Sequence, residues 1–167
     1  SYQRARRGLG RTFQVTRVFQ RMSVTQNLMV PALALSKISR SEVEERAHEV
    51  MAFLTIERLA DENAQNLSGG QQKLLELGRV LMLDPDVIFL DEPFAGIDPI
   101  AVEDIQYIVA KLKLRNIGIL ITDHNVQETL SITDRAYLMF EGGILSDGTA
   151  EQLAEDEIVR KVYLGKN

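Results

Sequence analysis

The sequence predicts an α/β fold in which helices pack against a parallel β-sheet. Two short apolar runs, residues 87–90 and 117–122, carry this prediction, because continuous apolar runs are typical of strands that are buried on both faces of such a sheet. A helical apolar stripe lies between them, over residues 99–114. Polar residues follow both runs directly, and open α/β sheets bind ligands at the carboxyl ends of their strands. We therefore expect the functional site at that edge of the sheet.

The composition is that of an ordinary globular domain. The chain has 167 residues, of which 45% are hydrophobic and 26% charged, and this length is enough for one domain with a substantial core. No apolar run approaches the roughly 20 residues that span a bilayer, and the start of the chain has no signal-peptide pattern. We therefore expect that the chain is not itself embedded in a membrane, and the absence of cysteine fits a cytosolic protein. The absence of cysteine excludes disulfides, thiolate metal sites and cysteine nucleophiles.

The charge is distributed unevenly along the chain. The net charge of -5 combines +8 over residues 1–41, which contain no acidic residue, with -13 over the rest. A basic segment of this kind can bind nucleic acid, anionic lipid or nucleotide phosphate, or it can be a solvated and partly unstructured end of the chain. Charge alone leaves these alternatives open.

The first elements along the chain are expected to be helical. Residues 1–11 show little hydrophobic periodicity and are expected to form an irregular, arginine-rich lead-in. The apolar pattern over residues 25–35 predicts a helix, which Pro31 is expected to kink. Ser41 and Glu44 have the spacing of a capping box, so a second helix is expected to begin there. Both helices precede the first predicted strand.

Two further helices are marked by their N-caps. Ser68 and Gln71 form another capping box, so a helix is expected to start near Gly69. Asp98 is a good N-cap with Pro99 at the first helical position, and that helix is expected to run to about Leu114. The remaining elements are expected to be a short helix over residues 128–132, a hairpin over 136–145 with its turn at 141–143, a short helix capped by Thr149 and Gln152, and a last helix over 158–163.

Two groups of residues near the first predicted strand are suited to ligand binding and catalysis. Gly69 and Gly70 stand at a helix N-terminus, where free N–H groups and the helix dipole favour an anion and where glycine allows close approach. Asp91 and Glu92 follow the strand, where one carboxylate can hold Mg²⁺ through its water shell and the next can orient or deprotonate a water molecule. A phosphate site beside a metal and a base suggests nucleotide hydrolysis.

These motifs resemble those of the ABC-type ATPases. The run Leu-Ser-Gly-Gly-Gln at residues 67–71 matches the family's signature motif in full, residues 87–92 match its Walker B strand, and residues 94–99 resemble its D-loop. The resemblance implies that the chain uses ATP and Mg²⁺, and that a second ATPase subunit completes the site. It assigns the following roles: Asp91 on Mg²⁺, Glu92 as the base that polarises water, and Ser68, Gly69, Gly70, Gln71 and Asp98 at the nucleotide or the opposite subunit.

Two more residues take roles from the resemblance. Gln14, within Arg-Thr-Phe-Gln, looks like the glutamine of the Q-loop, which reaches Mg²⁺ and the attacking water. His124 follows the strand at residues 117–122 and looks like the histidine of the H-loop, which contacts the γ-phosphate. Without that context, Gln14 would be an ordinary surface glutamine and His124 would be compatible with a structural hydrogen bond.

The resemblance also implies a domain organisation. It predicts a P-loop NTPase-like parallel sheet with an inserted helical signature subdomain at about residues 25–83, followed at about 84–167 by the latter half of the core α/β subdomain, with a hairpin and helices. The family's phosphate-binding motif, Gly-x-x-x-x-Gly-Lys-Ser/Thr, does not occur in the 167 residues. The chain thus resembles the latter two-thirds of such an ATPase, with the N-terminal strands and the P-loop missing. We expect it to hydrolyse ATP weakly or not at all alone, and to self-associate through an exposed hydrophobic sheet edge.

The implied function is that of a nucleotide-binding subunit, peripheral on the inner face of the cell membrane, which couples ATP hydrolysis at a dimer interface to transport through transmembrane permease subunits. Similarity to ATPases of branched-chain amino-acid importers lies in residues 11–14 and 67–85, and these amino acids are the favoured substrate. Similarity to the ATPase of lipopolysaccharide export lies in residues 94–105 and 122–130. A non-catalytic module of the same fold is the alternative. An ABC-type DNA-repair ATPase, and with it a nucleic-acid partner, is disfavoured because the segment between Gln14 and Ser68 lacks cysteines and sustained heptads.

Overall fold

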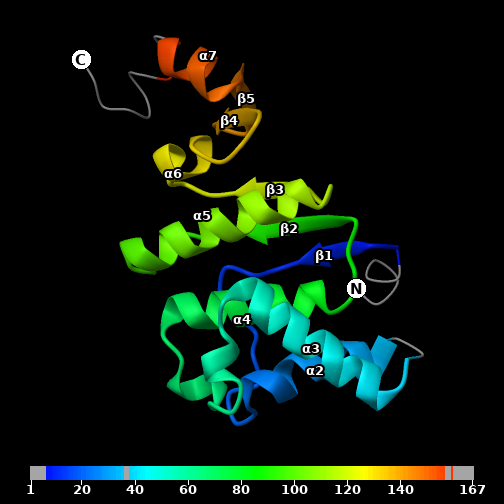
Figure 1. Cartoon of the computed structure of the whole chain (residues 1–167). Coiled ribbons are helices and arrows are strands. Elements are labelled where there is room, and N and C mark those ends of the chain that lie inside the picture. The colour runs from blue at the N-terminus through cyan, green and yellow to red at the C-terminus, as the bar shows by residue number, and fades with distance from the viewer. Residues whose placement is uncertain (1–6, 36–37, 157–158, 160–167) are drawn as a thin grey trace. The chain divides into compact units, whose positions relative to one another are not determined.

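The computed structural model describes residues 7–35, 38–156 and 159 of the chain. Residues 1–122 and 123–167 form two compact units. In the first unit, strands β1 (Leu9–Arg11), β2 (Val87–Asp91) and β3 (Gly118–Thr122) form a parallel sheet in the order β1-β2-β3 (Figure 1). The predicted α/β class with a parallel sheet is therefore confirmed.

Strand β1 corrects the expectation that residues 1–11 lack regular structure. Leu9 pairs with Val87 and Arg11 with Phe89 in parallel register. The strand is only three residues long and contains a glycine, so it has no periodicity of its own to predict it. Its pairing with β2, far along the sequence, makes it a strand.

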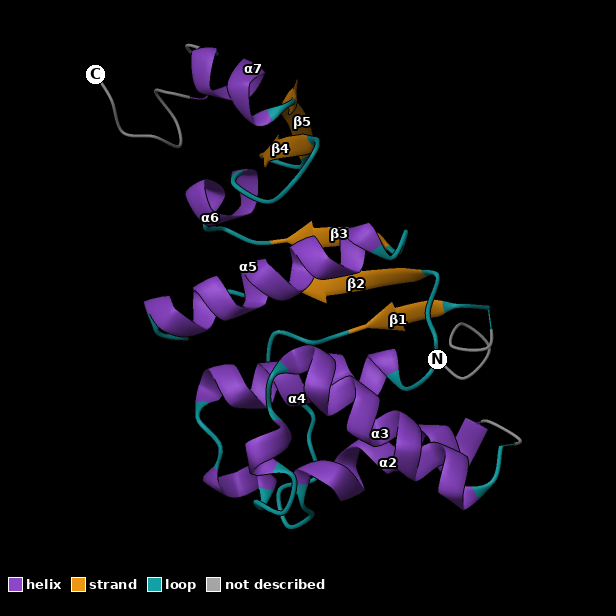
Figure 2. Ribbon diagram, in the orientation of Figure 1, coloured by secondary structure: helices purple, strands orange, loops and turns teal. Residues whose placement is uncertain are grey.

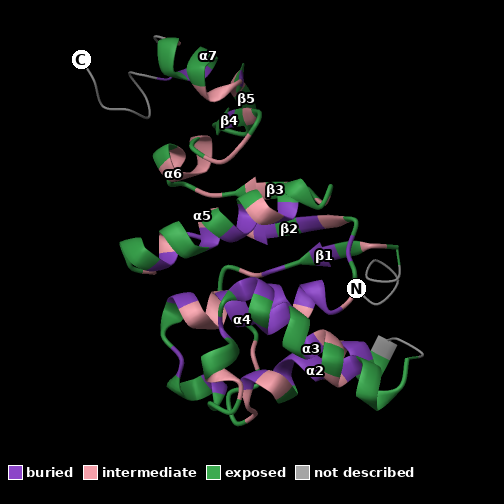
Figure 3. Cartoon of the chain, in the orientation of Figure 1, coloured by how far each residue is buried: buried purple, intermediate pink, exposed green. Residues whose placement is uncertain are grey.

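The helices α4 (Gly69–Leu81) and α5 (Pro99–Leu114) pack against the sheet, α4 against β1 and α5 against β3. Ile88 and Leu90 of β2 are buried at 0% and 3% exposure, whereas Phe89 on the opposite face is 36% exposed. Leu120 of β3 is 51% exposed. Figure 3 shows β3 in the colours of exposed and intermediate residues. The prediction that both strands are buried on both faces was therefore wrong, because in the described part of the chain β2 and β3 alternate between a covered and an uncovered face.

The uncovered face borders a groove of about 920 Å³, lined by Leu9, Phe89 and Leu120 among other residues. Apolar side chains that are exposed on an open sheet favour pairing or packing with another segment of chain. Self-association of the isolated chain was expected through an exposed hydrophobic sheet edge, and it stays a prediction.

The helical block ahead of β2 consists of α2 (Val24–Leu35), α3 (Arg40–Leu54) and α4, linked by 3₁₀ turns at Glu57–Leu59 and Ala64–Asn66 (Figure 2). Gly78 lets α4 approach its neighbours closely, because a Cβ atom there would lie 2.7 Å from Leu28 of α2 and 2.9 Å from Leu54 of α3. The predicted helix around Pro31 is confirmed, with that proline inside α2.

The capping box of α3 is not the predicted one. Ser39 and Glu42 make the reciprocal side chain–backbone bonds, so the expected cap at Ser41 and Glu44 was wrong. Both pairs fit the Ser-x-x-Glu pattern, and the earlier one lets the helix begin at Arg40, which forms a 2.9 Å ion pair with Glu44.

The second unit contains α6 (Val126–Leu130), β4 (Ala136–Phe140), β5 (Gly143–Gly148) and α7 (Ala150–Glu155). The two strands form an antiparallel hairpin, and Thr149 and Gln152 form the capping box of α7, both as predicted. The expected helix over residues 128–132 starts earlier, at Val126, because Asn125 caps it. Of the helix expected over residues 158–163, only Val159 lies within the described residues.

Candidate functional site

The signature residues form the start of α4. Ser68 Oγ accepts a hydrogen bond from Gln71 N at 3.3 Å, and Gln71 Oε1 accepts one from Ser68 N at 3.0 Å, so the predicted capping box is present. N–H groups in the first turn of a helix have no acceptor within it. The predicted anion-favouring helix N-terminus is therefore formed, with Gly69 and Gly70 in its first turn.

The D-loop lies beside this helix start. A Cβ atom on Gly69 would lie 3.7 Å from Ile97, and one on Gly70 would lie 2.3 Å from Cβ of Ala101. Asp98 Oδ1 accepts a hydrogen bond from Ala101 N at 3.0 Å, which makes it the N-cap of α5, as predicted. The signature motif and the D-loop, separated in the sequence by the whole of α4 and β2, thus lie side by side.

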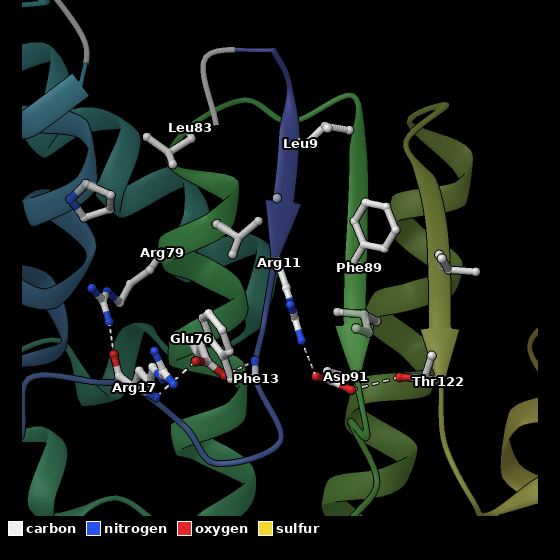
Figure 4. Close-up of a pocket in the computed structure, with 15 residues that line it drawn as sticks. Leu9, Arg11, Phe13, Arg17, Glu76, Arg79, Leu83, Phe89, Asp91 and Thr122 are labelled. Atoms are coloured by element: carbon white, nitrogen blue, oxygen red, sulfur yellow. Dashed lines mark hydrogen bonds and ion pairs between the residues drawn. The ribbon is translucent and has the colours of Figure 1, made fainter. Parts of the chain in front are cut away.

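The carboxylate of Asp91 stands at the carboxyl end of β2. Its oxygens accept hydrogen bonds from Arg11 Nη2 at 2.8 Å and from Thr122 Oγ1 at 3.0 Å, so the contacts cross all three strands (Figure 4). The Arg11 and Thr122 hydrogen bonds hold the pKa of Asp91 below its ordinary value. Asp91 therefore offers ionised oxygens at the carboxyl end of a strand, where open α/β sheets bind their ligands.

Glu92 follows in an unusual backbone conformation. Its φ is 47°, in the left-handed region that non-glycine residues rarely adopt, and its N–H donates to the carbonyl of Thr122 at 2.7 Å. Lys73 Nζ of α4 donates to the carbonyl oxygen of Glu92 at 2.7 Å. Strained positions of this kind occur at active sites because the surroundings fix the direction of the side chain.

The structure brings Gln14 to Glu92, although 78 residues separate them in the sequence. Gln14 Nε2 donates a hydrogen bond to Glu92 Oε2 at 2.8 Å. An amide and a carboxylate in contact provide the oxygen donors and the base that a Mg²⁺–phosphate complex and an attacking water require. Within the described residues, no group of three His, Cys, Asp or Glu side chains could hold a metal ion alone. Carboxylate and amide oxygens are the kind of ligand that Mg²⁺ prefers, and Mg²⁺ in nucleotide sites takes further ligands from phosphate and water.

His124 belongs to the second compact unit, and its Nδ1 lies 3.6 Å from Oδ1 of Asp123. Its role at the γ-phosphate stays a prediction. Sequence reasoning missed the roles of Arg11, Lys73 and Thr122. Arg11 was assigned to the lead-in, and nothing in the local sequence marks the two other side chains as neighbours of the carboxylates.

The strand-end carboxylates, the capped signature helix and the Gln14–Glu92 contact are the features expected of a nucleotide site of the ABC type. Residues 1–95 match the family model described as "ABC transporter". The chain belongs to the ABC transporter family and is an ATP-binding subunit of that family.

Among curated relatives, the chain is 44% identical over 164 residues to the lipopolysaccharide export system ATP-binding protein LptB of Escherichia coli strain K12, a match that covers 98% of this chain and 68% of the relative. It is 42% identical to the protein of the same name in Haemophilus influenzae, with 99% of this chain and 68% of that one covered.

Solved structures of ABC ATP-binding cassettes share the fold. The ADP conformation of MJ1267, an ATP-binding cassette of an ABC transporter, superposes with a TM-score of 0.83 at 32% identity, over 99% of this chain and 71% of that one. The protein cbiO1 from Clostridium perfringens, part of the ABC transporter complex cbiONQ, gives a TM-score of 0.82 at 32% identity, over 95% and 64%. The predicted fold is confirmed.

Proposed function

We propose that this chain carries the hydrolytic half of an ATP site in an ABC transporter, with Glu92 as the base. The observation that carries the proposal is the 2.8 Å hydrogen bond between Gln14 Nε2 and Glu92 Oε2. It places the side chain of the Q-loop against the strand-end carboxylate, where an attacking water would have to be held and deprotonated.

In this proposal Asp91 and Gln14 hold Mg²⁺, which when bound offsets the charge of the transferred phosphate. Glu92 polarises the attacking water, and His124 contacts the γ-phosphate. Ser68, Gly69, Gly70 and Gln71, with Asp98, face the nucleotide held by a second ATPase subunit. The 167 residues contain no Gly-x-x-x-x-Gly-Lys-Ser/Thr motif.

The proposed domain organisation keeps the helical signature subdomain at about residues 25–83 and the latter half of the core at about 84–167. The packing of α2, α3 and α4 as one helical block supports the first of these. No helix within the described residues is long and apolar enough to cross a bilayer. We place the subunit in the cytoplasm, as one of two ATPase subunits on the inner face of the membrane, bound to transmembrane permease subunits.

For the transported substrate we propose lipopolysaccharide, because the relatives at 42–44% identity bear the name of that export system. None of the relatives reported above is named for amino-acid import, the class that the sequence motifs favoured. The test is complementation in an Escherichia coli strain depleted of its own lipopolysaccharide-export ATPase. The complete subunit should restore growth. If the subunit supports branched-chain amino-acid uptake and does not restore growth, the transported substrate is a branched-chain amino acid and not lipopolysaccharide.

Glu92→Gln tests the catalytic assignment. The amide keeps the shape of the side chain but cannot accept a proton, so we expect ATP turnover by the complete subunit to fall about 10²–10⁴-fold while ATP binding is retained. Glu103→Gln on the exposed face of α5 is the matched control and should leave turnover unchanged. Undiminished turnover in the Glu92 variant would refute the role of Glu92 as the base. A wild-type subunit that binds ATP without turnover would favour the non-catalytic alternative.

A further inference from the structure

A buried carboxylate on the signature helix has no part in the proposed chemistry. Glu76 of α4 is only 5% exposed. Glutamate is rarely buried unless its charge is satisfied, because moving a carboxylate out of water is costly. Burial raises the pKa of Glu76 despite its hydrogen bonds and the two cations that face it, Arg79 and Lys73. A helix that needed only an apolar core contact here would be more stable with leucine.

The carboxylate is used to bind backbone. Glu76 Oε2 accepts a hydrogen bond from the N–H of Phe13 at 3.3 Å, and Oε1 accepts one from the N–H of Arg17 at 3.0 Å (Figure 4). These two N–H groups lie on either side of Gln14. One side chain thus holds both ends of the short segment that presents the glutamine to Glu92.

Neighbouring side chains on the same face of α4 add to this clamp. Thr16 Oγ1 donates to Gln72 Oε1 at 3.2 Å, and Arg79 Nη1 donates to the carbonyl oxygen of Arg17. Positions 72, 76 and 79 are spaced i, i+4 and i+7, so their side chains form one stripe along the helix. These side chains bind residues 13–17 through two backbone donors, the N–H groups of Phe13 and Arg17, and one backbone acceptor, the carbonyl oxygen of Arg17.

The same helix reaches the other parts of the site. It begins at the signature motif, and Lys73, the residue after Gln72 and on the adjoining face, donates to the carbonyl oxygen of Glu92 at 2.7 Å. A displacement of α4 would therefore move the support of Gln14 and of Glu92 together, because an α-helix moves as a rigid element over this length.

We infer that Glu76 is a positioning residue. It holds residues 13–17 on α4, so that the side chain of Gln14 stays within hydrogen-bond distance of Glu92. This inference rests on the proposed function. A carboxylate suits the role because both of its oxygens accept. Glutamine at position 76 keeps one acceptor and turns an NH₂ group toward the other backbone N–H, which then loses its partner.

The test is a double-mutant cycle on ATP hydrolysis by the complete subunit in its transporter. Glu76→Gln should lower kcat about tenfold, which corresponds to about 1.4 kcal/mol, with KM for ATP changed less than about twofold. In a Gln14→Ala background the same change should have almost no further effect, because the residue through which Glu76 acts is gone. Glu49→Gln, at an exposed position of α3, is the matched control and should leave kcat unchanged.

A second readout does not depend on activity. In Glu76→Gln, the backbone amide of Phe13 or of Arg17, or both, should exchange hydrogen about tenfold faster. This is the change expected when one hydrogen bond to a charged group is lost. Exchange in β2 should stay unchanged, which excludes general unfolding.

Independent, additive effects of Glu76→Gln and Gln14→Ala, or unchanged exchange at both amides, would overturn the inference. An inactive wild-type subunit would instead contradict the proposed function, and the exchange measurement would still decide whether Glu76 holds the segment.

Discussion

The two glycines of the signature motif provide a sharp structural prediction, because they are adjacent in the sequence and differ in their surroundings. A Cβ atom on Gly70 would lie 2.3 Å from Cβ of Ala101, whereas one on Gly69 would meet nothing closer than 3.7 Å. Contacts below 3.0 Å are not tolerated without movement. Gly70→Ala must therefore push α4 and α5 apart by about 1 Å or more, at the overpacking cost of about 1–3 kcal/mol.

Both substitutions replace glycine by alanine in the first turn of the same helix, so the gain in helix propensity, about 0.5–1 kcal/mol, is shared and cancels in their comparison. The free energy of unfolding of Gly69→Ala should thus exceed that of Gly70→Ala by about 1–3 kcal/mol, or about 4–8 °C in Tm at 2 kcal/mol for a subunit of 150–250 residues. Scanning calorimetry of the two variants, each against the wild type, measures this difference. Equal Tm values would refute the close approach of α4 and α5 at Gly70.

Three further predictions concern stability. Leu28→Ala, at a fully buried position of α2, should lower the free energy of unfolding by about 2–5 kcal/mol, whereas Leu33→Ala on the same helix, at 51% exposure, should cost far less in the same denaturant titration. Ser39→Ala should cost about 0.5–2 kcal/mol through loss of the α3 cap, and an equal effect of Ser41→Ala in thermal melts would contradict the assigned cap. Burial raises the pKa of Glu76, so the native state binds its proton more tightly than the unfolded state, and the stabilising contribution of this group should fall as pH rises above its ordinary value of 4.5. The Tm of the wild type should therefore decline relative to Glu76→Gln from about pH 4.5 upward, and a Tm difference that is independent of pH would count against a buried, titrating Glu76.

Local signals in the sequence predicted local structure well. The capping boxes at Ser68 and Thr149 and the N-cap at Asp98 form as predicted, because a cap depends on residues three or four positions away. The cap of α3 was misplaced because two overlapping Ser-x-x-Glu patterns compete, and local chemistry alone does not rank them.

Features that depend on distant parts of the chain were not predictable in this way. Strand β1 forms because it pairs with β2, and its three residues carry no pattern. Apolar runs in β2 and β3 indicated burial on both faces, but an apolar run cannot say which segments cover the sheet.

The candidate site shows the same division. The chemistry of Asp91 and Glu92 follows from their position after a strand, whereas Gln14 was singled out only by family resemblance. The contacts made by Arg11, Lys73 and Glu76 join residues far apart in the sequence and became visible only in the folded chain.

In the proposed function, ATP is hydrolysed between two subunits, with Glu92 from one and the signature motif from the other. The most direct test uses two complete subunits joined by a flexible linker, with Glu92→Gln and Ser68→Arg placed either in the same copy or in different copies. Suppose that each site combines Glu92 of one copy with Ser68 of the other copy. Two changes in the same copy then alter one residue in each site, so both sites are disabled. Two changes in different copies alter both residues of the same site, so the other site stays intact.

We therefore expect ATP hydrolysis by the linked dimer that carries the changes in different copies, and none by the dimer that carries both in one copy. The measurement is the steady-state ATPase rate of the two linked dimers, assembled with the transmembrane subunits. Hydrolysis by the dimer that carries both changes in one copy, and none by the dimer that carries them in different copies, would place Glu92 and Ser68 of one subunit at the same nucleotide and contradict a site shared between subunits.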